Sequence, residues 1–486
     1  MERRVKIVTT LGPAVNPSAD SEGRLRELIS AGADMVRINA AHGAVSDRAK
    51  LVQAVREAAK AVGKRVPILL DLQGLKIRTG VLAEAGKPVP FARGATVRLV
   101  PSPVVTTTEE IGVNYDKLLQ VVEPGSRVLI SDGLIEVLIE EVRSDHAIGT
   151  VSRGGLLLGR QGVTLPGAPI TGGALTDADK EDVKFAVEHE LDYLGLSFIS
   201  DASDLTLTRD VARAANPRVR IPGIISKIER PQALANLREI AESSDGIMVA
   251  RGDLGVQLPP ERVPRAQKEI IGIANQLGIP VITATQMLES MINQPVATRA
   301  ETSDVANAVW DGTDAVMLSA ESAVGKYPIE AVQTMDRIII EVEKDGPVRS
   351  ASSQISPVIE DTGARFSDAV ARAAFALSDQ TPAELLVVFS KSGASVRHIA
   401  KYRPGQPIIA AVDTEETARR INLVWGVESV VVPVETDPDA LFRKTGKLIV
   451  EAGLAKEGAY ALIVGSLPMT NESGRTNLVH FRRLGD

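Results

Sequence analysis

Charged and polar side chains stand at the ends of several short apolar runs of this sequence. In PGIISKIERPQ (222–232), one isoleucine separates Lys227 from Glu229. Side chains alternate across a strand, so both charged groups would project to the same side. For a single such pair, an exposed ion pair at a strand end is the ordinary alternative. Other runs end in the same way, with residues Arg37, Asn39, Asp71, Ser197, Asp253 and Thr285. The repetition favours one site at which these ends converge.

Two cations and two carboxylates of this set fit the chemistry of a phosphoryl group. Arg37 offers a planar fork of donors, and Lys227 offers a compact positive charge. Glu229 and Asp253, with no histidine or thiol beside them, suit a hard divalent ion such as Mg²⁺. Phosphoryl transfer mainly requires positioning and neutralisation of charge, which these groups can supply. The alternative for these carboxylates is a structural ion pair with a neighbouring arginine, such as Arg230 or Arg251.

The elements that must position these groups repeat along the chain. Eight short apolar runs occur, and most are followed by a segment with apolar residues at helical spacing. Repeated strand–helix alternation of this kind predicts a parallel (β/α)8 barrel, in which reactive groups gather at the carboxyl ends of the strands. The runs are KIVTTLG (6–12), MVRINA (35–40), PILLDL (67–72), YLGLSFI (193–199), GIISKIE (223–229), GIMVARGD (246–253), PVITATQ (280–286) and AVMLSAE (315–321).

Two stretches interrupt or follow this repeat. The segment 80–166 is rich in Gly, Pro, Thr and Val and predicts short antiparallel strands, hence an all-β lid domain, a small β-barrel, inserted in the main barrel. Hinges are expected near Gly80 and at LPGAP (165–169). The polar stretch 345–363 precedes four further strand–helix patterns, which indicate a C-terminal α/β domain. We therefore expect a barrel domain in two parts (1–79 and 167–344), a lid domain (80–166) and a C-terminal domain (345–486).

Composition narrows the possible partners. The chain has 486 residues, is 44% hydrophobic and 24% charged, and carries a formal net charge of −7. This acidic balance argues against a general nucleic-acid or anionic-membrane binder. The sequence contains no cysteine, which excludes disulfides and thiolate chemistry. Because no apolar run is long enough for a signal peptide or a membrane span, we expect a cytoplasmic protein.

One loop outside the barrel has the composition of an anion site. In VVFSKSGASVRHIA (387–400), a strand pattern passes through residues 390–395 into a helix pattern. Backbone amides at a helix start, three hydroxyls and a lysine would cradle a phosphate. Ordinary N-capping by a single serine is the simpler alternative. The expected effector-binding residues are Ser390, Lys391, Ser392, Gly393 and Ser395.

Taken together, the motifs of this chain resemble the signatures of the pyruvate kinase family, from end to end and in the family's order. That resemblance implies a barrel, a lid and a C-terminal regulatory domain. It also implies transfer of a phosphoryl group from phosphoenolpyruvate to ADP, the last step of glycolysis, with Mg²⁺ or alternatively Mn²⁺. The motifs are TTLGPA (9–14), VRINAAHG (36–43), DLQGLKIRTG (71–80), ISKIERPQ (225–232), IMVARGDLGV (247–256), ATQMLESM (284–291) and DGTDAVMLSAESAVGKYP (311–328).

The resemblance also implies roles for individual residues. Arg37 would clamp the substrate phosphate, and Lys227 would neutralise the phosphoryl group during transfer. Glu229 and Asp253 would ligate the metal, while the backbone of Gly252 and Asp253 would lie near the substrate carboxylate. Thr285 would stand beside the enolate and assist its protonation.

A second group of residues would serve the nucleotide. By resemblance, Arg78 and the segment from Asn39 to His42 would face ADP or ATP, and the lid would close over the mouth and exclude water. The same resemblance implies a homotetramer that a phosphorylated small molecule regulates.

Some positions depart from the family pattern. Ala41 and Leu72 stand where many members have a serine and a threonine, and Gln161 replaces a lysine of the lid. Lys76 stands where many members have a glutamate. The changes at positions 41, 72 and 76 fall in the region of the family's monovalent cation, which here comprises Asn39, Asp71 and Lys76, whereas Gln161 alters the expected nucleotide contacts. An ammonium carries the unit charge of K⁺, so we expect an enzyme that does not require potassium.

Two other functional classes remain open from the residues alone. A Mg²⁺-dependent barrel lyase acting on a pyruvate enolate would share Glu229, Asp253 and Thr285, but it would need neither Lys227 nor a lid. A nucleotide or sugar-phosphate sensor built on the C-terminal domain would not need an intact catalytic set. Formation of pyruvate from phosphoenolpyruvate and ADP would distinguish the three.

Overall fold

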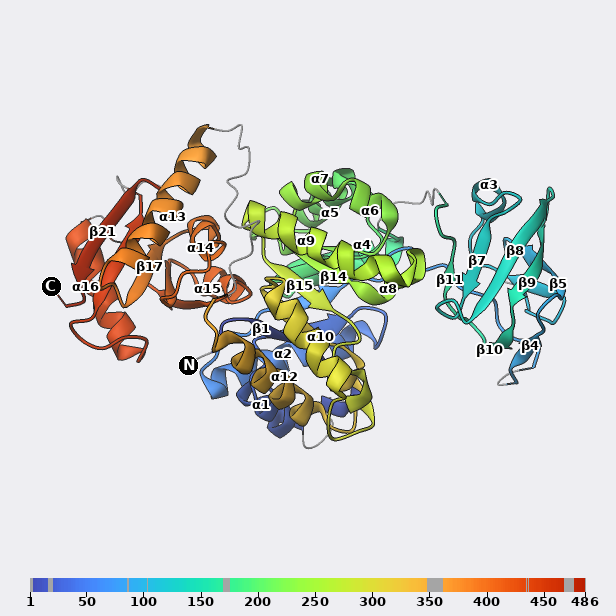
Figure 1. Ribbon diagram of the computed structural model, residues 1–486, viewed down its shortest axis with the longest axis horizontal. Coiled ribbons are helices and arrows are strands. Elements are labelled where there is room, and N and C mark those ends of the chain that lie inside the picture. Colours follow the sequence, from blue (N-terminus) through green and yellow to red (C-terminus); the bar gives the residue numbers. More distant parts are fainter. Residues whose placement is uncertain are drawn as a thin grey trace.

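The computed structural model describes residues 3–15, 21–84, 87–102, 104–168, 175–347, 362–433, 435, 437–466 and 476–485. Figure 1 shows a central barrel with a β-sheet unit on one side and an α/β unit on the other. The N-terminus lies at the junction of the barrel and the α/β unit, and the C-terminus lies at the far end of that unit. Within the described residues, every helix is too short or too polar to cross a membrane.

The central unit is a closed barrel of eight parallel strands. Their order around the barrel is β1-β16-β15-β14-β13-β12-β3-β2. The strands are buried along almost their whole length, as expected when helices cover a parallel sheet. Each lies within one of the eight predicted apolar runs, so the predicted barrel is confirmed. Their bounds are β1 (Lys6–Thr10), β2 (Met35–Asn39), β3 (Ile68–Asp71), β12 (Tyr193–Leu196), β13 (Gly223–Ile228), β14 (Gly246–Ala250), β15 (Val281–Ala284) and β16 (Ala315–Leu318).

Helices follow the strands and cover the outside of the barrel. Thr176 and Thr298 each begin a helix through a capping box, and left-handed glycines end two others at Gly63 and Gly278. The longer helices are α1 (Ser21–Ser30), α2 (Val45–Val62), α4 (Asp177–Glu188), α5 (Ala202–Ala215), α9 (Val263–Leu277), α10 (Arg299–Trp310) and α12 (Pro328–Glu343). Shorter ones are α6 (Pro231–Ala235), α7 (Leu237–Glu242), α8 (Arg251–Gln257) and α11 (Ala320–Ala323).

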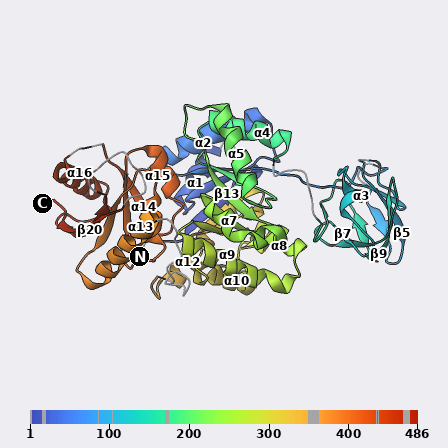
Figure 2. The same cartoon turned by 90° about the horizontal axis from the view of Figure 1, so that it is seen from above.

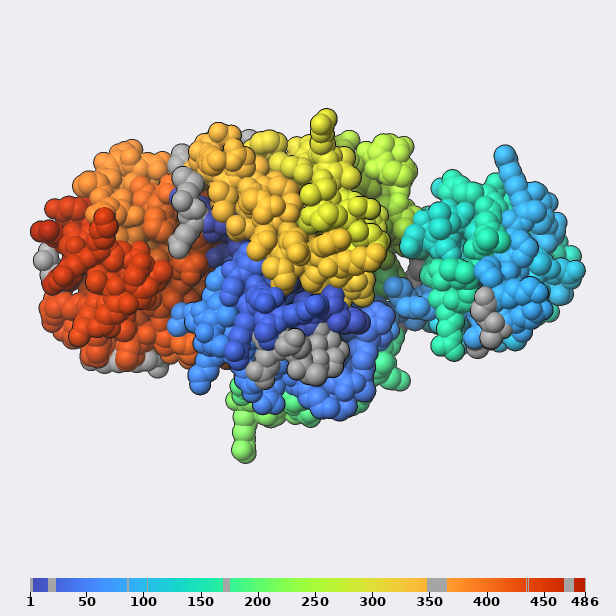
Figure 3. All heavy atoms as spheres, turned by 90° about the horizontal axis from the view of Figure 1, so that it is seen from below, coloured from blue at the N-terminus to red at the C-terminus, as the bar shows by residue number. Residues whose placement is uncertain are grey.

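Between β3 and α4 the chain forms the β-sheet unit, with a hydrophobic core of its own. A six-stranded sheet (β11-β7-β8-β9-β5-β6) and a two-stranded sheet (β10-β4) make up this lid, together with the one-turn helix α3 (Leu118–Val121). Figures 2 and 3 show the lid standing apart from the barrel on a narrow connection. The strands are β4 (Val89–Phe91), β5 (Thr96–Val100), β6 (Glu110–Gly112), β7 (Arg127–Ile130), β8 (Ile135–Val142), β9 (Ala147–Arg153), β10 (Gly155–Leu157) and β11 (Val163–Thr164).

The C-terminal unit is a five-stranded sheet of order β19-β18-β17-β20-β21. Its strands run parallel except β21, an antiparallel edge strand that the sequence pattern did not predict. The expected linker 345–363 lies mostly outside the described residues, as does part of the expected second lid hinge. The elements are α13 (Thr362–Gln380), β17 (Leu385–Phe389), α14 (Ala394–Ala400), β18 (Ile408–Val412), α15 (Glu415–Ile421), β19 (Val427–Val431), α16 (Pro438–Glu451), β20 (Tyr460–Gly465) and β21 (Leu478–Arg483).

The C-terminal domain covers the amino ends of the barrel strands. Leu423, which follows α15, is fully buried in the cluster of side chains that fills the barrel interior, alongside Met248 and Ile282. Around this contact, Arg419 donates to Asp192 at 3.0 Å, and the Tyr193 hydroxyl donates to the carbonyl of Arg420 at 2.9 Å. The C-terminal domain therefore closes the floor of the barrel and leaves the opposite end for the lid.

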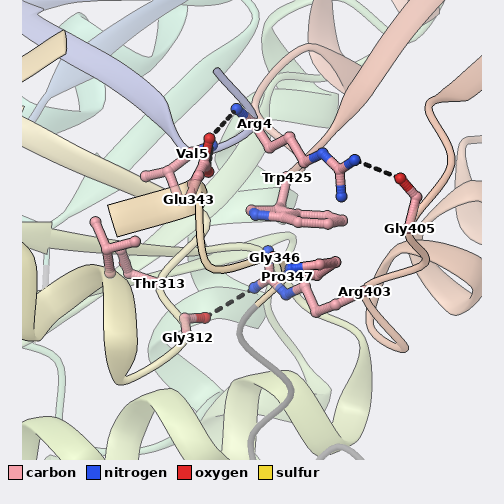
Figure 4. Close-up of a pocket in the computed structure, with 11 residues that line it drawn as sticks. Arg4, Val5, Gly312, Thr313, Glu343, Gly346, Pro347, Arg403, Gly405 and Trp425 are labelled. Atoms are coloured by element: carbon pink, nitrogen blue, oxygen red, sulfur yellow. Dashed lines mark hydrogen bonds between the residues drawn. The ribbon is translucent and has the colours of Figure 1, made fainter. Parts of the chain in front are cut away.

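A small cavity lies at the edge of this junction. Figure 4 shows the Trp425 ring between the guanidinium groups of Arg4 and Arg403, which lie 5.1 and 4.7 Å from the ring centre. The cavity beside them has a volume of about 120 Å³. Arg403 also donates to the Gly312 carbonyl at 2.8 Å, and the backbone amides of residues 4 and 5 donate to Glu343. The Arg403 hydrogen bond and the stacking of Arg4 on Trp425 join the two domains, whereas residues 4 and 5 contact Glu343 within the barrel domain.

Candidate active site

Lys227 is the centre of a charged cluster at the carboxyl ends of the strands. It lies near the end of β13, and its side chain is 12% exposed. Its ammonium lies 2.7 Å from Glu229 Oε1 and 3.2 Å from Asp71 Oδ1, and it donates to Ser197 Oγ at 2.8 Å. Burial alone would lower the pKa of Lys227, but the surrounding carboxylates raise it above the ordinary value. The structure thus holds a permanent point charge in the barrel mouth.

Asp71 ties this lysine to Arg37 on the neighbouring strand. The Arg37 Nε atom donates to Asp71 Oδ2 at 2.6 Å, and its Nη1 atom donates to Thr10 Oγ1 at 3.1 Å. Burial would raise the pKa of Asp71, but Lys227 and Arg37 together hold it below the usual range. Asp71 is therefore ionised and fixes both predicted phosphate-binding cations in one place.

Glu229 follows the last residue of β13 and is almost completely buried. Its Oε2 atom accepts a hydrogen bond from the Phe198 amide at 2.7 Å, whereas Oε1 has the ion contact with Lys227 but no hydrogen bond within the described structure. Burial, with the nearby charge of Asp253, raises the pKa of Glu229 to about 7, while Lys227 opposes that shift. An additional cation close to Glu229 would therefore stabilise the ionised form of this side chain.

Asp253 lies one element further along the chain than expected. The predicted strand 246–253 ends at Ala250, and the first turn of α8 contains Asp253. Within the described part of the chain, its carboxylate accepts no hydrogen bond and has no ion pair. Its charge nevertheless acts on both Lys227 and Glu229, so it belongs to the same cluster.

The expected alternative partners of these carboxylates are engaged elsewhere. Arg251 forms an ion pair with Asp304 at 2.7 Å, and the Arg230 guanidinium stacks over the Phe198 ring at 4.9 Å. Neither arginine forms an ion pair with Glu229 or Asp253 within the described residues. Mg²⁺ typically binds through one or two carboxylates plus water and substrate oxygens, so this donor set fits such an ion. No group of three or more acidic, His or Cys ligands occurs in the described ranges, so protein ligands alone would not complete the shell.

Thr285 joins this cluster from the end of β15. Its hydroxyl accepts a hydrogen bond from the Gly252 amide at 2.8 Å and donates to the Ala284 carbonyl at 2.7 Å. Thr285 and the adjacent Gln286 both adopt left-handed backbone conformations, with φ of 69° and 54°. Such a conformation is a clear outlier for a β-branched residue.

The residues assigned to the nucleotide and the monovalent cation are more dispersed. Asn39 ends β2 and caps the following turn, where its Oδ1 accepts from the Ala41 amide at 3.0 Å. His42 is exposed in that turn. Arg78 lies on the lid side of the hinge and donates to the Arg160 carbonyl at 3.3 Å. Lys76 is exposed, and its side chain has no hydrogen bond or ion pair in the described structure.

The candidate effector loop lies in the C-terminal domain, between β17 and α14. Ser390 Oγ accepts from the Gly393 amide at 3.0 Å, and Ser395 Oγ is 2.8 Å from Thr476 Oγ1. Gly393 has a φ of 83°, and the start of α14 has no side-chain cap. Two of the three hydroxyls therefore have partners within the domain, and Lys391 is exposed at the turn.

Sequence reasoning missed three contributors to the barrel mouth. Thr10 holds Arg37, the Phe198 amide holds Glu229, and Arg251 holds the backbone of the Thr285 loop. Thr10 lies in the predicted run 6–12, which was a usable signal. The other two act through a backbone amide and a distant loop, for which the sequence pattern offers no signal.

A closed (β/α)8 barrel with charged groups gathered at the carboxyl ends of its strands defines a barrel enzyme. The comparison with known proteins narrows this class. A profile described as "Pyruvate kinase, barrel domain" matches residues 2–332, and one described as "Pyruvate kinase, alpha/beta domain" matches residues 368–481. The chain belongs to the pyruvate kinase family, and it is a phosphotransferase of that family.

Individual pyruvate kinases match this chain along its whole length. The pyruvate kinase of Mycobacterium intracellulare is 39% identical over 486 residues, covering all of this chain and 99% of that protein. The pyruvate kinase of Staphylococcus aureus (strain USA300) is 39% identical over 489 residues, covering all of this chain and 81% of that protein. The crystal structure of a pyruvate kinase from Cryptosporidium parvum superposes with a TM-score of 0.90 at 35% identity, covering 99% of this chain and 96% of that one. Pyruvate kinases use phosphoenolpyruvate and ADP as substrates.

Proposed function

We propose that the barrel mouth transfers the phosphoryl group of phosphoenolpyruvate to ADP with a divalent ion, Mg²⁺ by preference, held by Glu229 and Asp253. In the transfer, the bond between phosphorus and the enol oxygen breaks, and a bond to a β-phosphate oxygen of ADP forms. The enolate left behind takes a proton at its terminal carbon to give pyruvate. The observation that carries this proposal is the Lys227 ammonium, fixed by Asp71, Glu229 and Ser197 where the barrel gathers its charged groups.

The two cations of the cluster would act on the phosphoryl oxygens. Arg37 presents a guanidinium that Asp71 and Thr10 already orient, so it would bind the phosphate of the incoming substrate without reorganisation. Lys227 would then offset the negative charge on the group during transfer. A preorganised charge in a buried site costs no reorganisation as the reaction proceeds. The raised pKa of Lys227 keeps it charged through the cycle.

We assign metal binding to the two carboxylates because the surrounding residues neutralise their negative charges only in part. Asp253 forms no ion pair within the described residues, and the pKa of Glu229 is raised because it is buried and lies near Asp253. A bound divalent ion supplies charge neutralisation for both carboxylates and for the substrate oxygens. The Asp253 amide at the start of α8 would face the substrate carboxylate beside the Gly252 backbone, whose own amide donates to Thr285.

Thr285 is the residue that we assign to protonation of the enolate. Its hydroxyl contacts the Gly252 amide, which brings it beside the residues assigned to the substrate carboxylate. From this position it would orient a water molecule that protonates the enolate. Closure of the lid would exclude other water and protect the phosphoryl group from hydrolysis.

The nucleotide would bind between the barrel mouth and the lid hinge. We assign Asn39 and His42 on the barrel side and Arg78 on the lid side to this region. Arg78 lies in the connection that would move with the lid, so ADP binding and lid closure would be coupled.

Potassium independence is the second part of the proposal. Both oxygens of Asp71 are already in contact with cations, Oδ1 with Lys227 and Oδ2 with Arg37. The side-chain carbonyl oxygen of Asn39 already accepts a hydrogen bond from the Ala41 amide. Lys76 is free to approach the mouth when the lid closes and would supply the unit charge internally.

Regulation is the third part. We propose that the loop containing Ser392 and Gly393 binds a phosphorylated small molecule, and that a homotetramer changes its substrate affinity in response. The left-handed glycine and the uncapped start of α14 support an anion at this loop. Since the C-terminal domain closes the barrel floor through Leu423, a change in its position would reach the barrel interior.

A coupled assay for pyruvate tests the central proposal. Purified protein should form pyruvate only with phosphoenolpyruvate, ADP and Mg²⁺ present, and removal of Mg²⁺ by chelation should abolish the activity reversibly. Lys227→Met should lose nearly all transfer yet still exchange protons at the methyl carbon of pyruvate. Lys180→Met, which removes an exposed lysine of α4 paired with Asp177, is the matched control. Pyruvate formed without consumption of ADP would instead indicate a lyase.

A further inference from the structure

The catalytic threonine of the proposed site is held in a conformation that it would not adopt by itself. Thr285 and Gln286 are consecutive non-glycine residues with φ of 69° and 54°. A β-branched side chain crowds the backbone in this region, so other contacts must maintain it. The direction of the Thr285 hydroxyl depends on that backbone conformation. Whatever fixes the two adjoining carbonyl groups therefore also fixes the hydroxyl.

Arg251 contacts both of those carbonyl groups. Its Nε atom donates to the Ala284 carbonyl at 3.2 Å, and its Nη2 atom donates to the Thr285 carbonyl at 2.7 Å. The Ala284 carbonyl is also the acceptor of the Thr285 hydroxyl. A single guanidinium thus spans the peptide unit from which the threonine side chain projects.

The guanidinium is itself firmly anchored. Its Nη1 atom donates to Asp304 Oδ1 at 2.8 Å, its Nη2 atom lies 2.7 Å from Asp304 Oδ2, and the side chain is 11% exposed. Asp304 belongs to α10, whereas Arg251 begins α8, so two helices support the loop after β15. Because guanidinium is planar, its several donors have fixed directions that a lysine could not reproduce.

The next residues of the loop are fixed in other ways. The amide of Leu288 donates to Glu321 at 3.1 Å, and that of Ser290 donates to Glu301 at 2.7 Å. Arg251 contacts the two carbonyls at the start of the loop and, through Nη2, Met287 Sδ at 2.8 Å. Its effect should therefore be concentrated on the first residues of the loop, which include Thr285, rather than spread over the whole loop.

We propose that Arg251 is a positioning residue that holds the Thr285 hydroxyl in its reactive direction. This inference rests on the proposed role of Thr285 in protonation of the enolate. Arg251 does not contact substrate or metal in this assignment, since its donors point to the loop and to Asp304. It acts through the peptide unit between Ala284 and Thr285.

The substitution Arg251→Lys keeps the positive charge and the aliphatic stem but loses the fork. We expect kcat to fall about 10- to 100-fold, as for a catalytic group displaced by about 1 Å. The KM for ADP should change little, and the rate of proton exchange at the methyl carbon of pyruvate should fall with kcat. Arg238→Lys is the matched control, because Arg238 is an exposed helix arginine with one acidic partner, Glu242.

A double-mutant cycle separates positioning from a general structural role. If Arg251 acts through Thr285, Arg251→Lys should have almost no further effect on kcat in a Thr285→Ala background. In the protein that keeps Thr285, adding Gln286→Gly to Arg251→Lys should partly restore kcat, because glycine adopts positive φ without strain. Thermal melting of each variant shows that the compared proteins are folded.

Three outcomes would overturn the inference and can be told apart. If Thr285→Ala has full activity, the proposed role of Thr285 fails and the inference fails with it. If Thr285→Ala is impaired but Arg251→Lys lowers kcat by the same factor in both backgrounds, only the positioning role is wrong. Equal kcat values for Arg251→Lys and the wild type would also refute it.

Discussion

The ammonium nitrogen of Lys227 lies 2.7 Å from Glu229 Oε1. A single buried isoleucine separates the two residues in sequence. Strand alternation brings both side chains to the barrel mouth, while Ile228 points into the surrounding core. The pair is not a self-sufficient ion pair, because burial beside Asp253 raises the pKa of Glu229 to about 7. The relationship is that of two groups arranged for a third charged partner.

Removing the charge of Glu229 should therefore weaken binding of the divalent ion more than folding. We expect Glu229→Gln to raise the Mg²⁺ concentration required for half-maximal activity at least about tenfold, since the amide is a poorer ligand. Direct binding of Mn²⁺, followed by electron paramagnetic resonance, gives a readout that does not depend on turnover. Glu242→Gln, at an exposed helix position, should bind Mn²⁺ as the wild type does. Unchanged Mn²⁺ affinity in Glu229→Gln would argue against the metal assignment.

Turnover should be the same in K⁺ and in a bulky tetraalkylammonium salt at fixed ionic strength and saturating Mg²⁺. The physical reason is that Lys76 provides the unit charge that K⁺ would otherwise bring. The variant Lys76→Glu should acquire activation by K⁺, whereas Lys87→Glu, which changes an exposed lid lysine, should not. Strong activation of the wild type by K⁺ would show that Lys76 remains in solvent throughout the cycle.

Truncation of Leu423 should loosen the C-terminal domain from the barrel floor. Leu423→Ala removes a fully buried side chain from the barrel interior, and changes of this kind cost about 2–5 kcal/mol. We expect an earlier unfolding transition in urea. Leu377→Ala, where the side chain is 40% exposed, should cost much less. Equal shifts for the two variants would mean that the floor contact contributes little to stability.

Acid should destabilise the same junction through His398. Burial, aided by the charges of Lys401 and Arg397, lowers the pKa of His398 to about 4, and Asp368 only partly opposes this shift. The unfolded chain binds a proton near pH 6.5 and the folded one does not, so stability is full above about pH 7 and falls as the pH drops toward 4. Between pH 7 and 5 this group alone should remove about 1–2 kcal/mol.

The matched pair of variants isolates this contribution. His398→Gln cannot titrate, so the difference in unfolding free energy between pH 7 and 5 should shrink by that amount. His480→Gln, at an exposed position, should show the wild-type pH dependence. If His398→Gln loses stability with acid as steeply as the wild type, other groups must account for the acid response.

A negative charge in the C-terminal loop should prevent activation by phosphorylated compounds. Ser392→Asp places a carboxylate where the phosphate is expected, and like charges at close range repel strongly. We expect the half-activating concentration of any sugar phosphate or nucleotide that activates the wild type to rise at least about tenfold. Gln380→Asp adds the same charge at an exposed position of the domain. A normal response from Ser392→Asp would place the effector elsewhere.

Local patterns were sufficient for the barrel and for most of the charged cluster. The eight strands occupy the predicted apolar runs, because strands buried on both faces must be apolar along their length. Lys227, Glu229 and Asp71 could be grouped in advance because the closed parallel barrel brings the carboxyl ends of its strands together. The edge strand β21 was missed, since none of its residues is fully buried and its sequence, LVHFRR, lacks the alternation of a half-buried strand.

Contacts between distant segments were decided only by the tertiary structure. No local pattern shows that Leu423 fills the barrel interior, or that Arg251 spans the peptide unit before Thr285. Asp253 lies in a helix rather than at a strand end, because α8 begins directly after Ala250. The sequence by itself determined which residues are buried in strands and which charged groups lie at their ends, because these follow from spacing along one chain segment. The directions of those groups depend largely on partners from other strands and loops, whose geometry exists only once the barrel has closed.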